Sequence, residues 1–418
     1  MAEGVTVPPA EPHGRGAARS PPSGALSHIR VLDLSRVMAA PWCTQILADL
    51  GADVIKIERP GEGDDTRGWG PPFLPGGRDA GYFLACNRGK RSVTVDMGRP
   101  EGQAIIRKLA ESSDVCVENF KVGSLAKYGL DAASLRALNP RLVYASVTGF
   151  GQTGPRASQA AYDFAIQAMG GLMSITGERD DVPGGGPQKV GVPVVDLMSG
   201  MYATVGILAA LERRNITGVG ETIDVAMLDV MSAFLSNQAM NFFMGGATPS
   251  RQGNRHPNVQ PQDVYACRDG HFVLAVGNDG QFAKMAAAMG HPEWSADERF
   301  TTNRGRVVNG DAMRAALTAR FAELTRAEVT ARLESAGVPC APINSIPQVF
   351  EEPQLQHRNM LRQLPHATGT VPSVVSPLNF SETPLRFDRG PPTLGQHTAE
   401  VLAELGLDHA VLSAKGVV

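Results

Sequence analysis

The sequence has few cysteines, no obvious metal-ligand cluster and almost no net charge. Its five cysteines are scattered over 418 residues, form no C-x-x-C pair and have no histidine at a metal-ligand spacing. This argues against a disulfide scaffold and against a structural metal, and it indicates a reducing compartment, so we expect a cytoplasmic protein. A formal net charge of -3 provides no overall field that would hold nucleic acid or an anionic membrane.

Long apolar runs are also missing. The longest stretch of low polarity, residues 190–211, is interrupted by Pro193, Asp196 and several glycines, whereas a membrane span needs roughly 18 apolar residues. Residues 1–27 are rich in Pro, Gly, Ala and Arg but lack the continuous apolar centre of a secretory signal. We therefore expect a soluble protein whose first 27 residues form a disordered tail.

What the sequence does contain is the composition of a globular protein of more than one lobe. Hydrophobic residues make up 43% and charged residues 19%, and the length is too great for one ordinary core. We expect a large domain over residues 28–225, linker helices and a small domain over 226–335, and a return to the large domain over 336–418.

The first half alternates β-rich runs with helical patterns, which predicts parallel βαβ units and a Rossmann-like, doubly wound α/β fold. Helices are expected at 41–50 and 100–111, each opened by a proline. The second half predicts a hairpin at 264–276, helical structure over 281–333 and a last helix at 398–405, which together indicate a smaller α+β lobe. The expected strands of the large domain are residues 29–34, 53–58, 92–95, 114–118 and 142–147.

Asp196 lies between a loop rich in glycine and proline and a strong apolar helix at 197–214. Taken alone, an aspartate in this position is a favoured helix N-cap rather than a catalytic group. However, the small residues Ser199 and Gly200 follow it, so the backbone can approach closely and leave room for a ligand. We expect the helix N-terminus to lower the pKa of this carboxylate and to supply N–H groups to a developing oxyanion.

Basic residues gather at two predicted strand ends. Arg88, Lys90 and Arg91 precede one strand, and Lys56 and Arg59 lie at the end of another. Such residues are most often solvated surface charges. The strand ends of an open α/β sheet are nevertheless where ligands bind, and a phosphorylated cofactor needs cations.

Two further patterns are weaker. Residues 149–154 match G-x-G-x-x-G after a predicted strand, but a polar loop follows, so a tight turn is favoured over a dinucleotide site. His256 alone is an ordinary loop histidine, while its neighbour Arg255 makes a carboxylate-binding site conceivable.

Several ordered blocks together resemble the family III CoA-transferases, the group of formyl-CoA:oxalate and carnitine CoA-transferases and α-methylacyl-CoA racemases. The resemblance covers nearly the whole chain after the tail. It is carried by residues 30–35 (RVLDLS), 51–60 (GADVIKIERP), 87–93 (NRGKRSV), 114–120 (DVCVENF), 162–163 (YD) and 195–200 (VDLMSG).

The resemblance implies the substrate, the nucleophile and the CoA contacts. Acyl-CoA would be a substrate, no prosthetic group would be needed, and the nucleophile of the family falls on Asp196, which would carry an aspartyl-CoA thioester. A polar glutamine of the oxalate branch is replaced here by Met38, so an oxyanion role cannot be carried over to it. The positions of the family's CoA contacts fall on Val37, Ala39, Arg59, Asn119 and Lys127.

The resemblance also implies an interlocked homodimer of two ring-like subunits. It leaves a racemase or epimerase as an alternative, but the racemase branch has a histidine where this chain has Tyr162, which removes a proton carrier. A catalytically silent CoA-binding protein is the third possibility. We expect the partners to be an acyl-CoA and a small carboxylic acid; at least one substrate would be a dicarboxylate such as succinate, with Arg255 or His256 holding its distal carboxylate.

Overall fold

A six-stranded parallel sheet forms the centre of the larger lobe in the computed structural model, which describes residues 24–418; the predicted tail therefore lies outside the described residues except for residues 24–27. The strand order β3-β2-β1-β4-β5-β6 reverses direction between β1 and β4, and ligands of such sheets bind at this switch point. The strands are β1 (Arg30–Asp33), β2 (Asp53–Glu58), β3 (Arg91–Thr94), β4 (Val115–Glu118), β5 (Val143–Thr148) and β6 (Thr222–Ala226).

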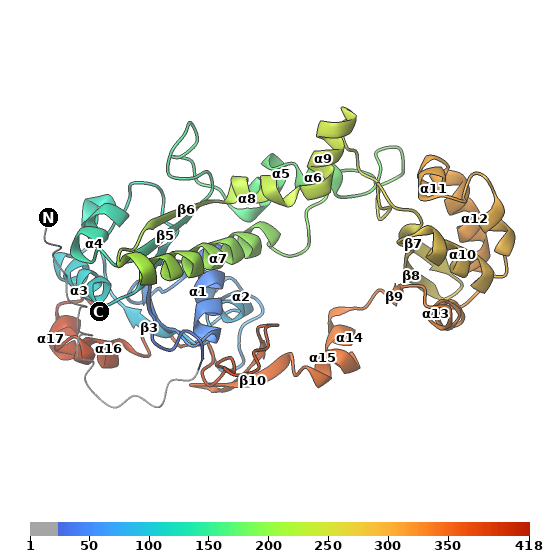
Figure 1. Cartoon of the computed structure of the whole chain (residues 1–418). Coiled ribbons are helices and arrows are strands. Elements are labelled where there is room, and N and C mark those ends of the chain that lie inside the picture. Colours follow the sequence, from blue (N-terminus) through green and yellow to red (C-terminus); the bar gives the residue numbers. More distant parts are fainter. Residues whose placement is uncertain (1–23) are drawn as a thin grey trace, which may run out of the picture.

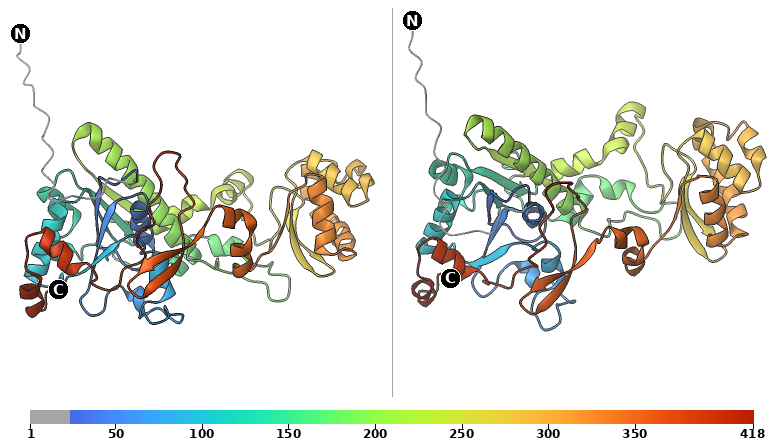
Figure 2. Two further views of the ribbon diagram at one scale, coloured as in Figure 1. Left: turned by 90° about the horizontal axis from the view of Figure 1, so that it is seen from below. Right: turned by 60° about the horizontal axis from the view of Figure 1, so that its bottom comes forward.

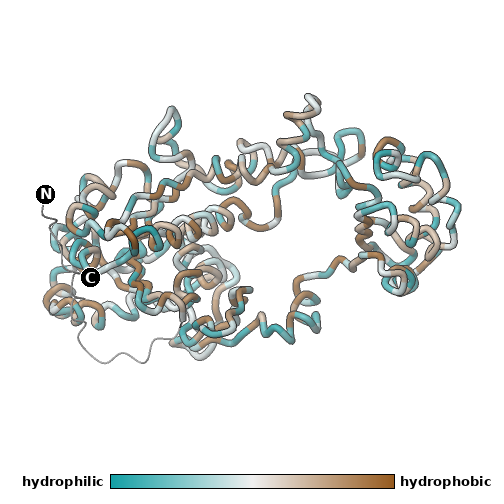
Figure 3. The backbone as a smooth tube through the Cα atoms, viewed as in Figure 1, coloured by the Kyte–Doolittle hydropathy of each residue, from teal (hydrophilic) through white to brown (hydrophobic). Residues whose placement is uncertain are grey.

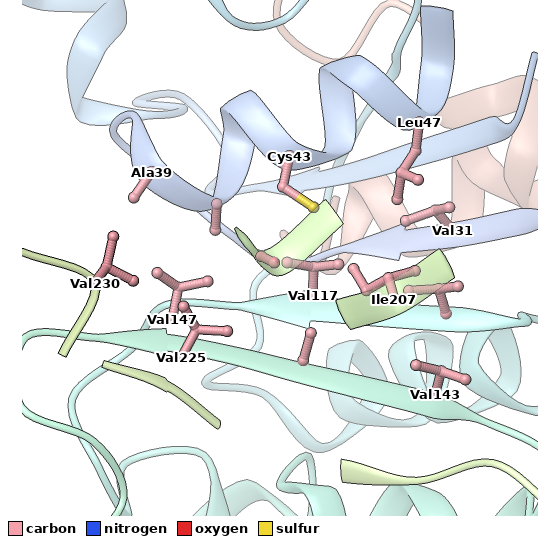
Figure 4. Close-up of a cluster of buried hydrophobic side chains, with 14 of the residues drawn as sticks. Val31, Ala39, Cys43, Leu47, Val117, Val143, Val147, Ile207, Val225 and Val230 are labelled. Carbon is pink, nitrogen blue, oxygen red and sulfur yellow. The ribbon is translucent and has the colours of Figure 1, made fainter. Parts of the chain in front are cut away.

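Helices cover both faces of this sheet because its strands are apolar on both sides. On one face, α1 (Ala39–Asp49) and α7 (Val194–Thr217) pack over Val31, Val117 and Val147, as Figure 4 shows. On the other face lie α3 (Pro100–Glu111), α4 (Ala132–Leu138) and α16 (Thr398–Glu404). By length and composition α7 could cross a membrane. In the structure it packs into the core along one side, through Ala203 and Ile207.

The smaller lobe has a core of its own. An antiparallel sheet of β7 (Gln262–Cys267), β8 (Gly270–Ala275) and β9 (Cys340–Pro342) is covered by helices. The β7–β8 hairpin turns where predicted, between Cys267 and Gly270. The helices of this lobe are α10 (Asp279–Ala288), η3 (Pro292–Ala296), α11 (Asn303–Val308), α12 (Gly310–Ala322) and α13 (Arg326–Ser335).

Two separate connections join the lobes, so the chain runs as a ring (Figures 1 and 2). The connections stay apart along their length in the tube view (Figure 3). The outgoing one carries α5 (Asp163–Met169), α6 (Leu172–Ile175), α8 (Met227–Phe234) and α9 (Ser236–Gly245). The returning one carries α14 (Ile346–Glu351), α15 (Pro353–His357), β10 (Leu361–His366) and β11 (Gly369–Val374).

The C-terminal segment of the chain packs against β3, the edge strand of the large sheet. The Thr398 hydroxyl accepts a bond from the backbone N–H of Thr94 on β3, and the N–H of Asp96 donates to the carbonyl of Val417 beyond α17 (His409–Ala414). These contacts satisfy backbone groups at the β3 edge, which would otherwise be open to pairing with another chain.

One feature differs from the sequence expectation and another agrees with it. The edge strand β6 was not predicted, because its Thr222 and Asp224 are polar and interrupt the apolar run. Residues 149–154 form a turn with Gly151 and Gly154 at positive φ, and the next helix begins only at Asp163, so the tight-turn interpretation is confirmed.

Candidate active site

Asp196 is the third residue of α7, within its first turn, rather than the N-cap that the sequence suggested. The N-cap is Pro193, whose side chain caps nothing. The carboxylate of Asp163, the first residue of α5, takes over this role. Its Oδ2 accepts bonds from the backbone N–H of Val195 at 2.7 Å and of Asp196 at 3.3 Å. A neighbouring helix thus supplies the cap for the helix that carries Asp196.

Close backbone contact joins α7 to α1 one turn after Asp196. A Cβ added to Gly200 would lie 2.6 Å from the Ala39 carbonyl oxygen and 3.0 Å from the Trp42 ring. Any larger residue would therefore push the helices apart. This contact places the first turn of α1 beside the first turns of α7.

The Asp196 carboxylate is electrostatically destabilised. Burial and then the Asp163 carboxylate raise its pKa to about 7, which corrects the expectation that the helix N-terminus would lower it. The reason is that Asp163 already occupies the N–H groups of that N-terminus. Among residues 24–418, no cation or hydrogen-bond donor contacts the Asp196 carboxylate in compensation.

Tyr82 of α2 (Gly81–Ala85) faces the same two carboxylates. Burial, followed by the charges of Asp196 and Asp163, raises the pKa of its hydroxyl. Its ring packs edge-on against Trp69, with centroids 5.3 Å apart. Trp69 lies in the long connection between β2 and α2, and Tyr82 lies at the start of α2.

A strained turn precedes α1. Val37 has φ of 70°, a conformation that costs a β-branched residue energy and persists only where its surroundings impose it. Its N–H is held by the buried Asp64, 3.2 Å away, and Asn119 bonds to both the N–H and the carbonyl of Arg36. Two of the predicted CoA contacts, Val37 and Asn119, therefore meet at this turn.

A cavity of about 330 Å³ lies at the carboxyl ends of β1, β2, β3 and β4. Arg59 and Lys127, both predicted CoA contacts, line it together with Arg36. Aromatic rings face these cations: the Arg36 guanidinium lies 5.7 Å from the Phe120 centroid, and the Lys127 ammonium lies 4.6 Å from that of Tyr128. Cations and flat rings suit a nucleotide with phosphate groups.

Arg88, Lys90 and Arg91, predicted to face CoA, are placed inside the protein. Arg88 pairs with Asp49, Lys90 with Asp33 at 3.0 Å, and Arg91 with Asp53 at 2.8 Å as well as with two glutamates of α16. Each charge is thus neutralised by a protein carboxylate. The position of these residues before a strand could not reveal this, because their partners come from other elements, and we no longer assign them to CoA.

Arg255 and His256, the predicted acid-binding residues, lie on the outgoing connection between α9 and β7 rather than beside Asp196. Arg255, between α9 and β7, pairs with the exposed Asp311 at 2.8 Å, and the Nδ1 atom of His256 accepts two backbone N–H groups of its own loop. Tyr162 is exposed and directly precedes Asp163. The structure thus brings Tyr162 near Asp196 but leaves Arg255 and His256 on the far connection.

Sequence reasoning assigned no role to Asp163, Gln167 or Tyr82. A weak signal existed for Asp163, because it belongs to the Tyr-Asp pair of the family blocks. Among residues 24–418, no three His, Cys, Asp or Glu side chains lie together so as to hold a metal ion.

The structure combines an open α/β sheet, with a cavity at its strand ends, and a buried carboxylate at the start of α7, and comparison with known proteins identifies its family. The model of CoA-transferase family III matches residues 26–398. The succinate–glutarate CoA-transferase of Agrobacterium fabrum is 48% identical over 392 residues, 93% of this chain and 96% of that protein. Mouse succinyl-CoA:glutarate CoA-transferase is 40% identical over 381 residues, 91% of this chain and 86% of that protein.

A solved structure supports the same family assignment. A CAIB/BAIF family protein from Brucella suis, 48% identical, superposes with a TM-score of 0.82 over 92% of this chain and 100% of that one. The chain belongs to CoA-transferase family III, and it is an enzyme that transfers coenzyme A from an acyl-CoA.

Proposed function

We propose that this enzyme exchanges CoA between succinyl-CoA and a dicarboxylic acid such as glutarate, with Asp196 as the covalent nucleophile. The observation that carries the proposal is the Asp196 carboxylate, buried at the start of α7 with no stabilising cation and a pKa raised to about 7. The substrate pair is supported by the names of the two relatives that are 48% and 40% identical. Because these relatives are named as transferases, the racemase and the silent-protein alternatives lose support.

The chemistry follows from this carboxylate. An Asp196 oxygen attacks the thioester carbonyl, the C–S bond breaks, and an aspartyl–succinyl anhydride and CoA thiolate form. The thiolate then attacks the aspartyl carbonyl, which releases succinate and leaves an aspartyl-CoA thioester. A glutarate carboxylate attacks that thioester, the C–S bond breaks, and an aspartyl–glutaryl anhydride and CoA thiolate form. The thiolate then attacks the glutaryl carbonyl, so that glutaryl-CoA leaves and Asp196 is a carboxylate again.

A raised pKa suits the nucleophile in two ways. A more basic carboxylate is a better nucleophile, provided that it is ionised at the working pH. Conversion of Asp196 to a neutral anhydride or thioester also removes its repulsion from Asp163, so the covalent states are favoured over the free carboxylate.

The substrate assignment can be tested by direct exchange. Enzyme incubated with succinyl-CoA and glutarate should form glutaryl-CoA and succinate in equal amounts, measured by mass spectrometry. Butyrate, which lacks a second carboxylate, should react with kcat/KM lower by about 10-fold or more, the effect of losing one charged hydrogen bond. An enzyme that uses butyrate as well as glutarate would contradict the dicarboxylate assignment but not the transferase activity.

We assign the distal carboxylate of the acid to Arg255. Its present partner Asp311 is exposed, so a substrate carboxylate can replace it at little cost. In the same exchange assay, Arg255→Ala should raise KM for glutarate about 10-fold and leave that for butyrate unchanged. Arg299→Ala is the control, because Arg299 is an exposed arginine of the same lobe with its own partner, Asp297. Equal losses for both acids would refute the assignment.

Asp196 lies in the large lobe and Arg255 on the connection that enters the small lobe, so we also propose that two chains interlock as a homodimer in which one chain's Arg255 serves the other's Asp196. The ring of the chain supports this (Figure 3). Further support comes from the connections, where Phe243, Met244 and Ile346 are each more than 70% exposed. Apolar surface of this kind marks a protein interface.

Light scattering tests the dimer. The particle should have twice the mass of the 418-residue chain and should keep it on dilution to nanomolar concentration, because interlocked rings separate only when one unfolds. Mixing Asp196→Ala with Arg255→Ala chains during refolding should restore part of the exchange activity. In such a mixed dimer, one of the two sites keeps both residues. A monomeric, fully active enzyme would exclude the arrangement.

A further inference from the structure

Gln167 is a fully buried side chain of α5, one turn after Asp163. Its amide Nε2 donates to Asp163 Oδ1 at 2.6 Å, and its Oε1 accepts from the backbone N–H of Val190 at 2.9 Å. The amide orientation is fixed, since one end needs an acceptor and the other a donor. Gln167 therefore connects Asp163 to the glycine-rich loop of residues 177–193.

Both oxygens of Asp163 are thereby engaged. Oδ1 receives the Gln167 amide, and Oδ2 receives the N–H groups of Val195 and Asp196. A continuous chain of hydrogen bonds thus leads from Val190 through Gln167 and Asp163 to the backbone of Asp196. The chain contains no exposed link that solvent could replace easily.

We propose that Gln167 is a positioning residue for the reaction: it holds Asp163 as a charged cap on α7, and Asp163 in turn keeps the Asp196 carboxylate destabilised and reactive. This inference rests on the proposed role of Asp196. The Gln167 amide holds Oδ1 of Asp163, so Oδ2 stays directed at the N–H groups of Val195 and Asp196.

The surroundings of Asp196 leave Asp163 as the dominant charge. Tyr82 approaches from α2 and is neutral at physiological pH, and α1 packs on α7 at Gly200 through the uncharged Ala39 and Trp42. The raised pKa of Asp196, caused by burial and Asp163, agrees with this geometry. Without Gln167, Asp163 can rotate away from the N-terminus of α7, and the freed N–H groups and helix dipole then favour the charged form of Asp196 although it stays buried.

The test is the pH dependence of kcat/KM for succinyl-CoA, which rises as the nucleophile ionises. In the wild type its midpoint should lie near 7, as the pKa of Asp196 requires. Gln167→Met, which keeps the volume but removes both hydrogen bonds, should lower this midpoint by about one pH unit. It should also lower kcat about 10-fold at pH 8, because the nucleophile is less basic, while KM for succinyl-CoA stays the same.

A matched control separates positioning from packing. Gln45 is also buried, donates to the carbonyl of Ala85 and accepts from the N–H of Arg88. Gln45→Met should reduce the melting temperature as Gln167→Met does, but without moving the pH midpoint. Equal, unshifted midpoints in both variants would overturn the proposal.

A second variant covers the case in which Gln167→Met fails to fold. Asp163→Asn keeps an oxygen for the N–H groups of α7 but lacks the charge, and it should lower the midpoint by the same amount. The double variant should show no further shift if Gln167 acts through Asp163. Additive shifts, or an Asp163→Asn midpoint that stays near 7, would refute this inference, whereas an active Asp196→Ala enzyme would refute the proposed nucleophile itself.

Discussion

Asp196→Ala should reduce CoA exchange by about 10⁴-fold or more, since removal of a covalent nucleophile eliminates the reaction path and not merely one contact. The wild-type enzyme incubated with acyl-CoA should carry an adduct on the tryptic peptide of Asp196, which hydroxylamine removes. The variant should carry none. Mass spectrometry of intact protein and peptides measures both.

Removing the charge of Asp196 should stabilise the folded protein although it abolishes CoA exchange. Asp196 has a folded-state pKa near 7, above its value in an unfolded chain, so the folded state binds more protons between pH 4 and 7 and stability falls as pH rises through that window. Asp196→Asn has no such dependence. Its melting temperature should exceed that of the wild type by a margin that grows from pH 5 to pH 8.

Asp229 provides the control for these variants. It is the third residue of α8, as Asp196 is of α7, but it is exposed. Asp229→Ala should leave exchange unchanged and cost only a few tenths of a kcal/mol, the usual size of a charge–helix interaction at the surface. An Asp196→Ala enzyme that retains full exchange would end the assignment of the nucleophile.

The sheet and its helices could be predicted because their signals are local. Runs such as residues 53–58 contain β-branched residues and are buried on both faces, and Pro100 opens α3 as a proline at a first helical position should. The edge strand β6 was missed because the polar Thr222 and Asp224 interrupt its apolar run. Its pairing with β5 joins two segments that are distant in the sequence, so no local pattern predicts it.

The site was only partly predictable for a related reason. The family blocks pointed to Asp196, Arg59, Asn119 and Lys127, and the structure places Arg59 and Lys127 at one cavity, but the electrostatics depend on neighbours that are distant in sequence. Burial, followed by the charge of Asp163, reverses the expected direction of the pKa shift of Asp196, and Asp163 lies 33 residues earlier in the chain. No local pattern around Asp196 contains that information.

Arg67→Met should be the most destabilising single change proposed for this protein, at about 3–5 kcal/mol. The buried Arg67 guanidinium bonds both oxygens of Glu58, at 2.7 and 2.8 Å, and Asp79 at 2.7 Å. It also stacks 3.6 Å from the Phe83 centroid and donates to the carbonyl of Pro392 in the returning chain. Its loss leaves two carboxylates without their cation and removes one attachment of the return segment.

The pH dependence gives this prediction a distinct signature. Burial tends to raise the pKa of Glu58, but the hydrogen bonds and charge of Arg67, aided by Lys56, outweigh it and hold the pKa below its usual value. In the wild type this carboxylate therefore contributes stability that is present above its unfolded pKa and is lost as pH falls through the folded one. In Arg67→Met, burial should dominate and raise the pKa of Glu58, so the contribution changes sign and stability falls as pH rises.

Urea unfolding at pH 5.5 and pH 8 measures both effects. The deficit of Arg67→Met should be larger at pH 8, and adding Glu58→Gln should recover part of it, because the uncompensated charge is then gone. Arg213→Met is the control: Arg213 is a half-exposed arginine of α7 whose partner Glu221 is 4.0 Å away, and surface changes of this kind stay within about 0.5 kcal/mol. If Arg67→Met costs no more than Arg213→Met, the buried ion pairs of Arg67 do not hold the β2–α2 connection and the returning chain to the sheet.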